Sequence, residues 1–209
     1  MLGAEEIRYG QCLPCRVYPE TLERCNLCGK PLISEKGRCL SCRDNEEEHS
    51  WDRLWALFPY TGKYCKLLSE YKFGKNLAIG NFLAELVSEI IASDPVLHDA
   101  VIVPVPPRPG KIKDTGWDQV DYLVKRLGKN NPEREICRCL KRKRSKIQKK
   151  LKRDERRENL QGRIYCRGTP PQTALVIDDV ITTGSTLEVC AAALKAGGTE
   201  KVYGLCLFY

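Results

Sequence analysis

The strongest constraint on the fold of this chain lies near its C-terminus, in residues 174–187. Ala174–Ile177 is a short and fully apolar run, which predicts a buried strand of a parallel sheet. Asp178 and Asp179 follow at the carboxyl end of this strand, which is the edge of an open α/β sheet where ligands bind. A loop of hydroxyl residues and glycine leads from there into an expected helix that ends at Gly197. The stretch therefore predicts one strand–loop–helix unit of an α/β fold.

The same stretch has the chemistry of a ligand site. Adjacent carboxylates repel each other and cost stability unless a diol, a metal ion or a hydrogen-bond donor uses them. Hydroxyls and backbone N–H groups at a helix N-terminus form a ready anion site. The stretch resembles the phosphoribosyl-pyrophosphate (PRPP) signature of type I phosphoribosyltransferases. This resemblance implies that Asp178 and Asp179 are the catalytic pair that holds the ribose 2- and 3-hydroxyls, and that the 5-phosphate is bound by Thr182, Thr183, Gly184, Ser185 and Thr186.

A metal site is indicated near the N-terminus. Twelve cysteines are present, and six of them form three Cys-x2-Cys pairs within the first 42 residues. Cys25 and Cys28 are separated by ten residues from Cys39 and Cys42, so that two tight turns could point four thiolates at one ion. A redox dithiol is the competing interpretation, and two matched pairs argue against it. We predict a structural zinc site, because four thiolates leave no open coordination position for catalysis.

The third pair, Cys12 and Cys15, leaves several alternatives open. It could bind a second zinc ion, with His49 or Cys65 as a further ligand. It could also contribute to a site of a partner chain or be a relic. Finally, it could replace one of the later pairs at their ion, which would leave that pair spare.

Length and composition suggest two parts. A chain of 209 residues suits one α/β domain plus a small module, and we place a zinc-binding module at 1–48 and the larger domain at 49–209. No apolar stretch reaches the roughly 18 residues of a membrane span. Because the first residues carry Glu5 and Glu6 and no apolar region, we expect a cytoplasmic protein.

The rest of the chain continues the α/β pattern. Apolar runs predict strands at 100–105 and 201–208, and a strand or hood segment at 51–60. Helical periodicity predicts helices at 63–71, 77–91 and 117–127, the last of which is expected to stop at Gly128. The expected fold is a doubly wound α/β structure, in which helices flank a parallel sheet.

Further motifs resemble the ComF family. Val103–Pro106 reads Val-Pro-Val-Pro, and Gly116–Gln119 follows ten residues later, as do the VPVP and RGFNQ elements of that family. Residues 145–159 are similar to its T-x2-Q-x2-L and ER-x2-N elements. The resemblance implies a type I phosphoribosyltransferase fold joined to an N-terminal zinc ribbon, with PRPP, Mg²⁺ and zinc as ligands. It also implies a role in DNA uptake and natural transformation, with single-stranded DNA and a helicase-like protein as candidate partners.

The cations expected to face the pyrophosphate come from the loop at 106–116, namely Arg108, Lys111 and Lys113. Lys72 aligns with a Lys-Tyr-Arg-Gly element of the family and is a further candidate. A solvated surface side chain is the alternative for each lysine. Positive charge at these positions would stabilise the leaving pyrophosphate.

Two departures from the family pattern bear on activity. Thr115 stands where the family usually has Arg, and Asp118 where it has Asn. Both remove positive or donor character from the pyrophosphate loop, so we expect PRPP binding more firmly than turnover. One version is an enzyme that transfers a pentosyl group to an acceptor that the sequence does not identify. The alternative is an inactive PRPP or nucleotide sensor that binds single-stranded DNA or a helicase-like partner.

The basic character of the chain is concentrated in Arg138–Arg157. This segment has twelve Lys or Arg residues and two acids, whereas the whole chain has a net charge of +8. It falls where type I enzymes carry a loop that closes over PRPP, so a basic lid is one interpretation. A strip that binds nucleic acid regardless of sequence is another. A solvated charged helix is the third.

Overall fold

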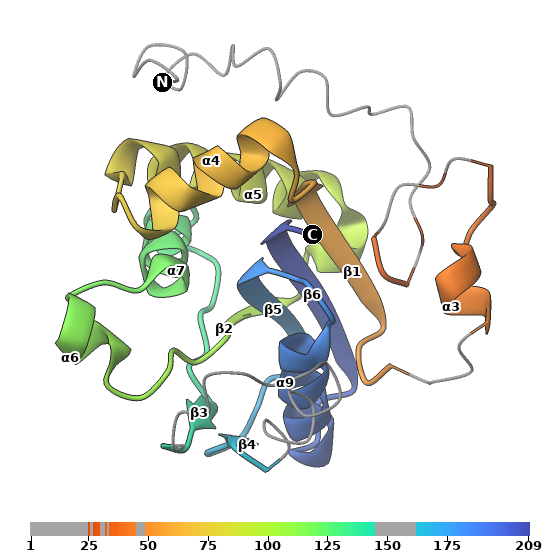
Figure 1. Cartoon of the computed structure of the whole chain (residues 1–209). Helices are drawn as coiled ribbons and strands as arrows, with labels where there is room; N and C mark the ends of the chain where they lie inside the picture. Colours follow the sequence, from red (N-terminus) through yellow and green to blue (C-terminus); the bar gives the residue numbers. More distant parts are fainter. Residues whose placement is uncertain (1–24, 26, 30–31, 33, 45–48, 145–161) are drawn as a thin grey trace.

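A parallel sheet forms the centre of the molecule. The computed structural model describes residues 25, 27–29, 32, 34–44, 49–144 and 162–209. Its four-stranded sheet is parallel throughout and has the order β1-β6-β5-β2 (Figure 1). The strands are β1 (Arg53–Phe58), β2 (Val101–Pro104), β5 (Thr173–Val180) and β6 (Lys201–Phe208). Three of the four strands were predicted as strands, and the segment at 51–60, for which a strand or a hood segment was predicted, contains the edge strand β1.

Helices cover both faces of the sheet, which confirms the predicted α/β class. One face carries α4 (Gly62–Lys72), α5 (Leu77–Ser93) and α7 (Gln119–Asn130). The other carries α9 (Ser185–Ala196) and a small antiparallel pair of strands, β3 (Leu140–Arg142) and β4 (Ile164–Cys166). The remaining short elements are α3 (Leu40–Asp44), η1 (Pro95–Leu97) and α6 (Lys111–Thr115). None of the described helices is both long and apolar enough to cross a membrane.

The side chains of β5 alternate between two apolar cores. Leu175 belongs to the core beneath α4, α5 and α7, and Val176 belongs to the core beneath α9. Because successive residues of a strand point to opposite faces of the sheet, this alternation continues into the acids. Asp178 is therefore directed to the α9 side and Asp179 to the side of α4 and α7.

The helix predicted at 117–127 was expected to stop at Gly128, and this prediction is wrong. Helix α7 continues through this residue to Asn130. A Cβ atom at Gly128 would lie 2.7 Å from Cδ1 of Ile136, so the position permits close packing of the helix against the segment that follows it. A glycine in a helix interior costs stability and commonly has such a packing reason.

Two further segments differ from their predictions. The loop at 106–116 contains one helical turn, α6, between Gly110 and Gly116, which both have positive φ (88° and 66°). In the basic segment, residues 140–142 form a strand rather than part of a charged helix, because β4 pairs with them. Residues 145–157 of that segment lie outside the described residues, as do Cys12 and Cys15.

Candidate functional site

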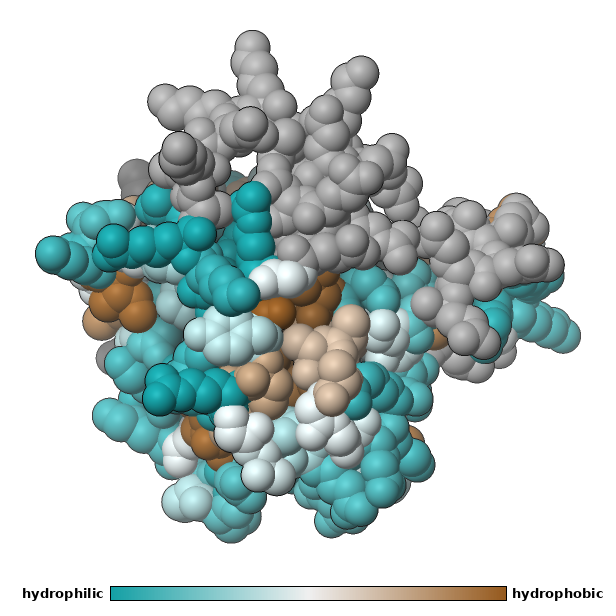
Figure 2. Space-filling view, turned by 90° about the horizontal axis from the view of Figure 1, so that it is seen from below, coloured by the Kyte–Doolittle hydropathy of each residue, from teal (hydrophilic) through white to brown (hydrophobic). Residues whose placement is uncertain are grey.

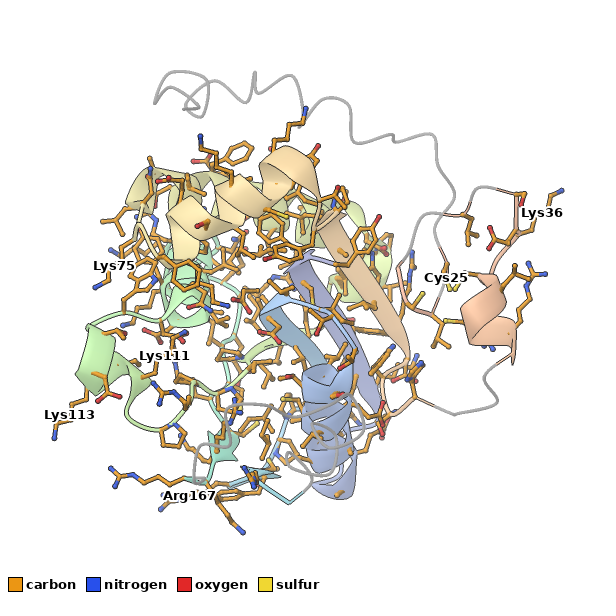
Figure 3. All side chains as sticks on the ribbon, viewed as in Figure 1. Cys25, Lys36, Lys75, Lys111, Lys113 and Arg167 are labelled. Atoms are coloured by element: carbon orange, nitrogen blue, oxygen red, sulfur yellow. The ribbon has the colours of Figure 1, made fainter. Side chains whose placement is uncertain are left out.

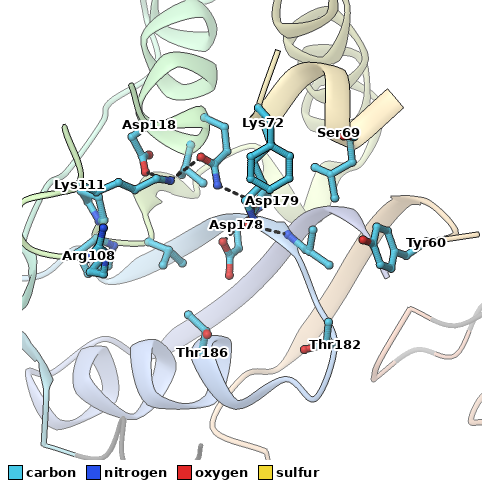
Figure 4. A pocket seen from close by; sticks show the side chains of 18 of the residues that line it. Tyr60, Ser69, Lys72, Arg108, Lys111, Asp118, Asp178, Asp179, Thr182 and Thr186 are labelled. Atoms are coloured by element: carbon cyan, nitrogen blue, oxygen red, sulfur yellow. Dashed lines mark hydrogen bonds and ion pairs between the residues drawn. The ribbon is translucent and has the colours of Figure 1, made fainter. Parts of the chain in front are cut away.

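A cavity of about 530 Å³ lies at the carboxyl ends of β2 and β5. Its size is that of a small-molecule site. Helix α4 turns one face toward it, with Cys65, Leu68, Ser69 and Lys72 at helical spacing. Most of the predicted ligand-binding residues line this one cavity: Asp178, Asp179, Thr182, Thr186, Arg108, Lys111 and Lys72 (Figure 4). The structure thus brings together residues that lie on three separate segments of the sequence.

The two acids point in opposite directions, as the alternation of β5 requires. Asp179 turns toward α4, where its Oδ2 accepts hydrogen bonds from Lys72 Nζ at 2.9 Å and Gln119 Nε2 at 2.6 Å. Asp178 turns toward Thr182 in the loop after β5 and Thr186 in the first turn of α9 (Figure 4). Its Oδ1 accepts a hydrogen bond from the backbone N–H of Asp179 at 2.8 Å. Adjacent residues therefore serve two sides of one cavity.

These surroundings shift the two pKa values apart. Burial raises the pKa of Asp178 well above its ordinary value of 3.8, and the negative charge of Asp179 raises it further. Burial also works against the Asp179 carboxylate, but the ammonium group of Lys72 and the bond from Gln119 bring the pKa of Asp179 below 3.8. Asp179 is thus the ionised member of the pair, and Asp178 keeps its proton to higher pH. Opposed shifts of this kind are frequent at functional sites.

The loop after β5 has the geometry of an anion site. Thr182 and Thr186 line the main cavity, whereas Thr183, Gly184 and Ser185 line a small adjoining hollow that also touches Asp178. The hydroxyls of Thr183 and Ser185 lie 2.7 Å apart. Gly184 has a φ of 77° and directly precedes Ser185, the first residue of α9. The positive end of this helix therefore begins beside the acids.

The two lysines of the 106–116 loop have different positions. Lys111 lines the main cavity, where its Nζ bonds to Asp118 Oδ2 at 2.7 Å and to the side-chain oxygen of Gln119. Lys113 points outward (Figure 3) and lines a second cavity of about 380 Å³ instead. Asp118, which stands where the ComF pattern has Asn, is the ion-pair partner of Lys111 and also caps α7. Arg108 lines both cavities.

Sequence reasoning missed two residues of the site. Gln119 was noted only as part of a motif, yet its side chain bonds to both Lys111 and Asp179. Arg142 comes from β3 and lines both cavities. Burial lowers the pKa of the Arg142 guanidinium, and the negative charge of Asp178 acts in the opposite direction. Nothing in a run of twelve cations distinguishes Arg142, because only the pairing of β3 with β4 places it there.

The four predicted zinc ligands form a compact cluster. The sulfur atoms of Cys25, Cys28, Cys39 and Cys42 all lie within 4.8 Å of one another. The turn after Cys25 is tight, with Gly29 N donating to Cys25 O at 2.9 Å and Cys28 N to Cys25 Sγ at 3.5 Å. Burial disfavours the Cys25 thiolate, but hydrogen bonds from the backbone N–H groups of Cys28, Cys39 and Leu27 lower its pKa to about 6. The cluster could hold a zinc ion, because four sulfur donors suit the tetrahedral preference of that metal.

The other residues considered for a second zinc ion do not join one another. The His49 ring stacks on the Trp51 ring at a centroid distance of 3.9 Å, and its Nδ1 lies 3.4 Å from Oε2 of Glu188. Cys65 lines the main cavity. Among the residues that the structure describes, the four-cysteine cluster is the one group of three or more such side chains with metal-binding spacing.

Comparison with known proteins gives relatives along most of the chain. It is 27% identical to competence protein F of Haemophilus influenzae over 202 residues, which are 92% of this chain and 87% of that protein. It is 26% identical to competence protein ComFC of Streptococcus pneumoniae, covering 86% and 78% of the two chains. It is 28% identical to DNA utilization protein YhgH of Salmonella typhimurium, covering 95% and 90%. No family model matches the chain.

Fold and site together define an α/β protein with a parallel sheet, an acid pair at a strand end and a cluster of four cysteines. Two of these relatives are named competence proteins and the third is named a DNA utilization protein, and each match covers at least 86% of this chain. The chain is therefore similar along most of its length to proteins named competence protein F and ComFC, in agreement with its resemblance to the ComF family.

Proposed function

We propose that this chain binds PRPP together with Mg²⁺ through a type I phosphoribosyltransferase domain. The observation that carries the proposal is the arrangement around β5. A buried acid pair, a hydroxyl loop and a helix N-terminus open into one cavity of about 530 Å³. Such a cavity has room for a sugar phosphate, and its anion-binding and diol-binding groups lie on adjoining walls.

Each part of PRPP has a matching group. The carboxylate of Asp179 accepts hydrogen bonds from the ribose diol, and the loop at 182–186 binds the 5-phosphate. Arg108, Lys111 and Arg142 line the cavity as the cations for the pyrophosphate. Mg²⁺ fits the site because hard cations take carboxylate and phosphate oxygens, which Asp178 and PRPP supply. When bound, it would add positive charge at the leaving pyrophosphate.

The proposed reaction is a transfer of the pentosyl group. An acceptor displaces pyrophosphate at C1 of the ribose, so the chain has to hold the sugar and offset charge rather than supply a nucleophile. Lys72 contributes by keeping Asp179 ionised. The relatives are named for competence and DNA utilization, and we place this chain in the same process of DNA uptake, in the cytoplasm. We keep the division into a zinc-binding module at 1–48 and this domain at 49–209.

Titration calorimetry with PRPP and Mg²⁺ tests the proposal. Wild type should bind, and Asp178→Asn combined with Asp179→Asn should weaken binding by more than about tenfold, because each charge-assisted hydrogen bond contributes about 1.5–3 kcal/mol. Asp99→Asn is the matched control, since this exposed acid lies at the amino end of β2, away from the cavity. No binding by wild type, or equal binding by the double variant, would reject the site.

A second candidate function is binding of single-stranded DNA on the β3–β4 surface. Tyr165 is 41% exposed on β4, and Lys143 Nζ lies 5.5 Å from the centre of its ring. Lys141 is the strand partner of Tyr165. Figure 2 shows the lower side of the molecule as drawn in Figure 1, where β3 and β4 lie, and on its described part hydrophilic residues surround a smaller apolar area. An aromatic ring among cations is the combination that stacks a base and holds its phosphates.

Single-strand affinity measured across a salt series tests this candidate. Lys141→Gln with Lys143→Gln should reduce the slope of log affinity against log salt by about 1.4, at about 0.7 per phosphate contact. Tyr165→Ala should weaken binding about tenfold and leave the slope unchanged, because stacking contributes about 1–3 kcal/mol per base. If the double lysine variant has the same slope as wild type, this surface does not bind the single strand. A helicase-like partner remains part of this alternative.

A further inference from the structure

Trp51 lies between the cysteine cluster and the loop that follows β5. It is almost completely buried, with 4% of its surface exposed. At one end of the indole, Nε1 donates a hydrogen bond at 3.2 Å to the carbonyl oxygen of Leu27, which lies between Cys25 and Cys28. At the other end, atom Cη2 would lie 3.0 Å from a Cβ atom added to Gly184. The Trp51 side chain therefore contacts both the turn between Cys25 and Cys28 and the loop after β5.

A second contact joins the residues around Trp51 to the start of α9. Glu188, in the first turn of that helix, accepts hydrogen bonds from Ser50 N at 3.2 Å and from Ser50 Oγ. Its other neighbour is His49, whose ring stacks on Trp51. In Figure 1 the segment that enters β1 comes from α3 and passes close to α9. Residues 49–51 thus form the link between the two regions.

The turn of the cluster is also pressed against the main sheet. Gly29 has a φ of 70°, and a Cβ atom there would lie 2.7 Å from the carbonyl oxygen of Leu54 in β1. The described apolar core around the four cysteines is otherwise small, with Leu32 and Leu27 as its other members. A small cysteine cluster with few buried apolar neighbours commonly depends on a bound metal for its structure. The position of the Leu27 carbonyl therefore depends on the state of the cysteine site.

We propose that Trp51 is a positioning residue that couples the four-cysteine site to the anion-binding loop at 182–186. A zinc ion in the cluster holds the turn, the turn holds the indole through Leu27, and the indole supports Gly184 in its left-handed conformation. Filling the cysteine site then orders the loop and raises its affinity for a phosphate ester. The identity of that ester rests on the proposed function, whereas the coupling does not.

Hydrogen exchange of the loop, measured without any ligand, tests the coupling. The probe is a peptide covering residues 180–188, compared in the zinc-loaded full chain and after removal of zinc by a chelator. Exchange in wild type should become about two- to tenfold faster on zinc removal, as expected for the loss of about one hydrogen bond. Trp51→Phe removes the N–H and the outer ring atoms, so its loop should exchange fast with or without zinc.

Trp55→Phe is the matched control. Trp55 also donates through Nε1 at 3.2 Å, but to Asp94 Oδ2, away from the cluster. This variant should keep the response to zinc, and zinc content is measured on every sample. The proposed coupling is overturned if zinc removal leaves hydrogen exchange of the wild-type loop unchanged. This outcome is measured on wild type alone. The coupling is also overturned if Trp51→Phe binds zinc and responds to its removal as strongly as wild type does.

Affinity for PRPP with Mg²⁺ forms a separate arm. Zinc removal should weaken binding about two- to tenfold in wild type and in Trp55→Phe, and should change it less than twofold in Trp51→Phe. If no sample binds PRPP while the exchange data follow the expected pattern, the proposed function fails and the coupling stands. If wild type binds PRPP and zinc removal does not change the affinity, the coupling fails and the proposed function stands.

Discussion

The opposite environments of the two acids predict opposite effects of the same substitution on stability. Asp179→Asn should destabilise the protein, whereas Asp178→Asn should stabilise it at neutral and higher pH. Asp179 Oδ2 accepts two hydrogen bonds, one of them from the ammonium group of Lys72. An asparagine would present an NH₂ group or a weaker acceptor to Lys72 and Gln119. Asp178 Oδ1 accepts a hydrogen bond from the backbone N–H of Asp179, and an asparagine oxygen would accept this bond equally well.

The size of the first effect follows from the contacts that are lost. Breaking a fully buried ion pair costs about 3–5 kcal/mol, and a fully exposed pair contributes about 0–1 kcal/mol. The side chain of Lys72 is 32% exposed and that of Asp179 is 11% exposed, so water offsets part of the loss. We expect Asp179→Asn to cost about 2–3 kcal/mol, which lowers the melting temperature by about 4–12 °C for a chain of this size.

The pH dependence of the two variants has opposite sign as well. The pKa of Asp179 is lowered in the folded state, so its contribution is present above the ordinary value of 3.8 and is lost as pH falls through the folded pKa. The pKa of Asp178 is raised, so the stability linked to its proton is present below 3.8 and is lost as pH rises through the folded pKa. The cost of Asp179→Asn should therefore shrink in acid, and the gain from Asp178→Asn should grow in base.

Thermal unfolding of wild type and both single variants between about pH 2 and pH 9 is the assay, because the loss of the Asp179 contribution lies below the ordinary pKa of 3.8. The two variants differ by one position and carry the same chemical change, so each is the control for the other. Equal melting temperatures for the two variants at pH 8 would refute the reasoning. So would a loss of stability in Asp178→Asn that grows with pH.

Three other predictions concern the cavity and the cysteine turn. Arg142→Gln should weaken PRPP binding about tenfold, as expected for one charge-assisted hydrogen bond, with the melting temperature unchanged; full affinity in calorimetry would remove Arg142 from the site. PRPP affinity with Mg²⁺ should rise with pH as Asp178 loses its proton, and calorimetry in buffers of different ionisation enthalpy should show proton release; an affinity independent of pH contradicts this. Gly29→Ala should cost about 2 kcal/mol in denaturant unfolding, because a side chain at its positive φ would meet the Leu54 carbonyl; equal stability would show that the turn does not dock on β1.

The errors of the sequence-based predictions have specific physical reasons. Gly128 was expected to end a helix, because glycine is a common stop signal, but a distant contact with Ile136 explains it. Lys111 and Lys113 are indistinguishable as charges in one loop, and a single turn of helix directs one into the cavity and the other to solvent. Arg142 lay within a charged run, and its place in the cavity depends on a strand partner beyond residue 161.

The sequence by itself determined whatever depends on neighbours along the chain. The acid pair, the hydroxyl loop and the helix start follow one another in residues 174–187, and strand alternation and loop length place them whatever the rest of the fold. The cysteine spacing likewise predicted the cluster. The tertiary structure decided which acid is charged, because Lys72 and Gln119 reach Asp179 from two other helices. It also decided that Trp51 touches both the cysteine turn and the loop, because contacts between distant segments exist only after the chain has folded.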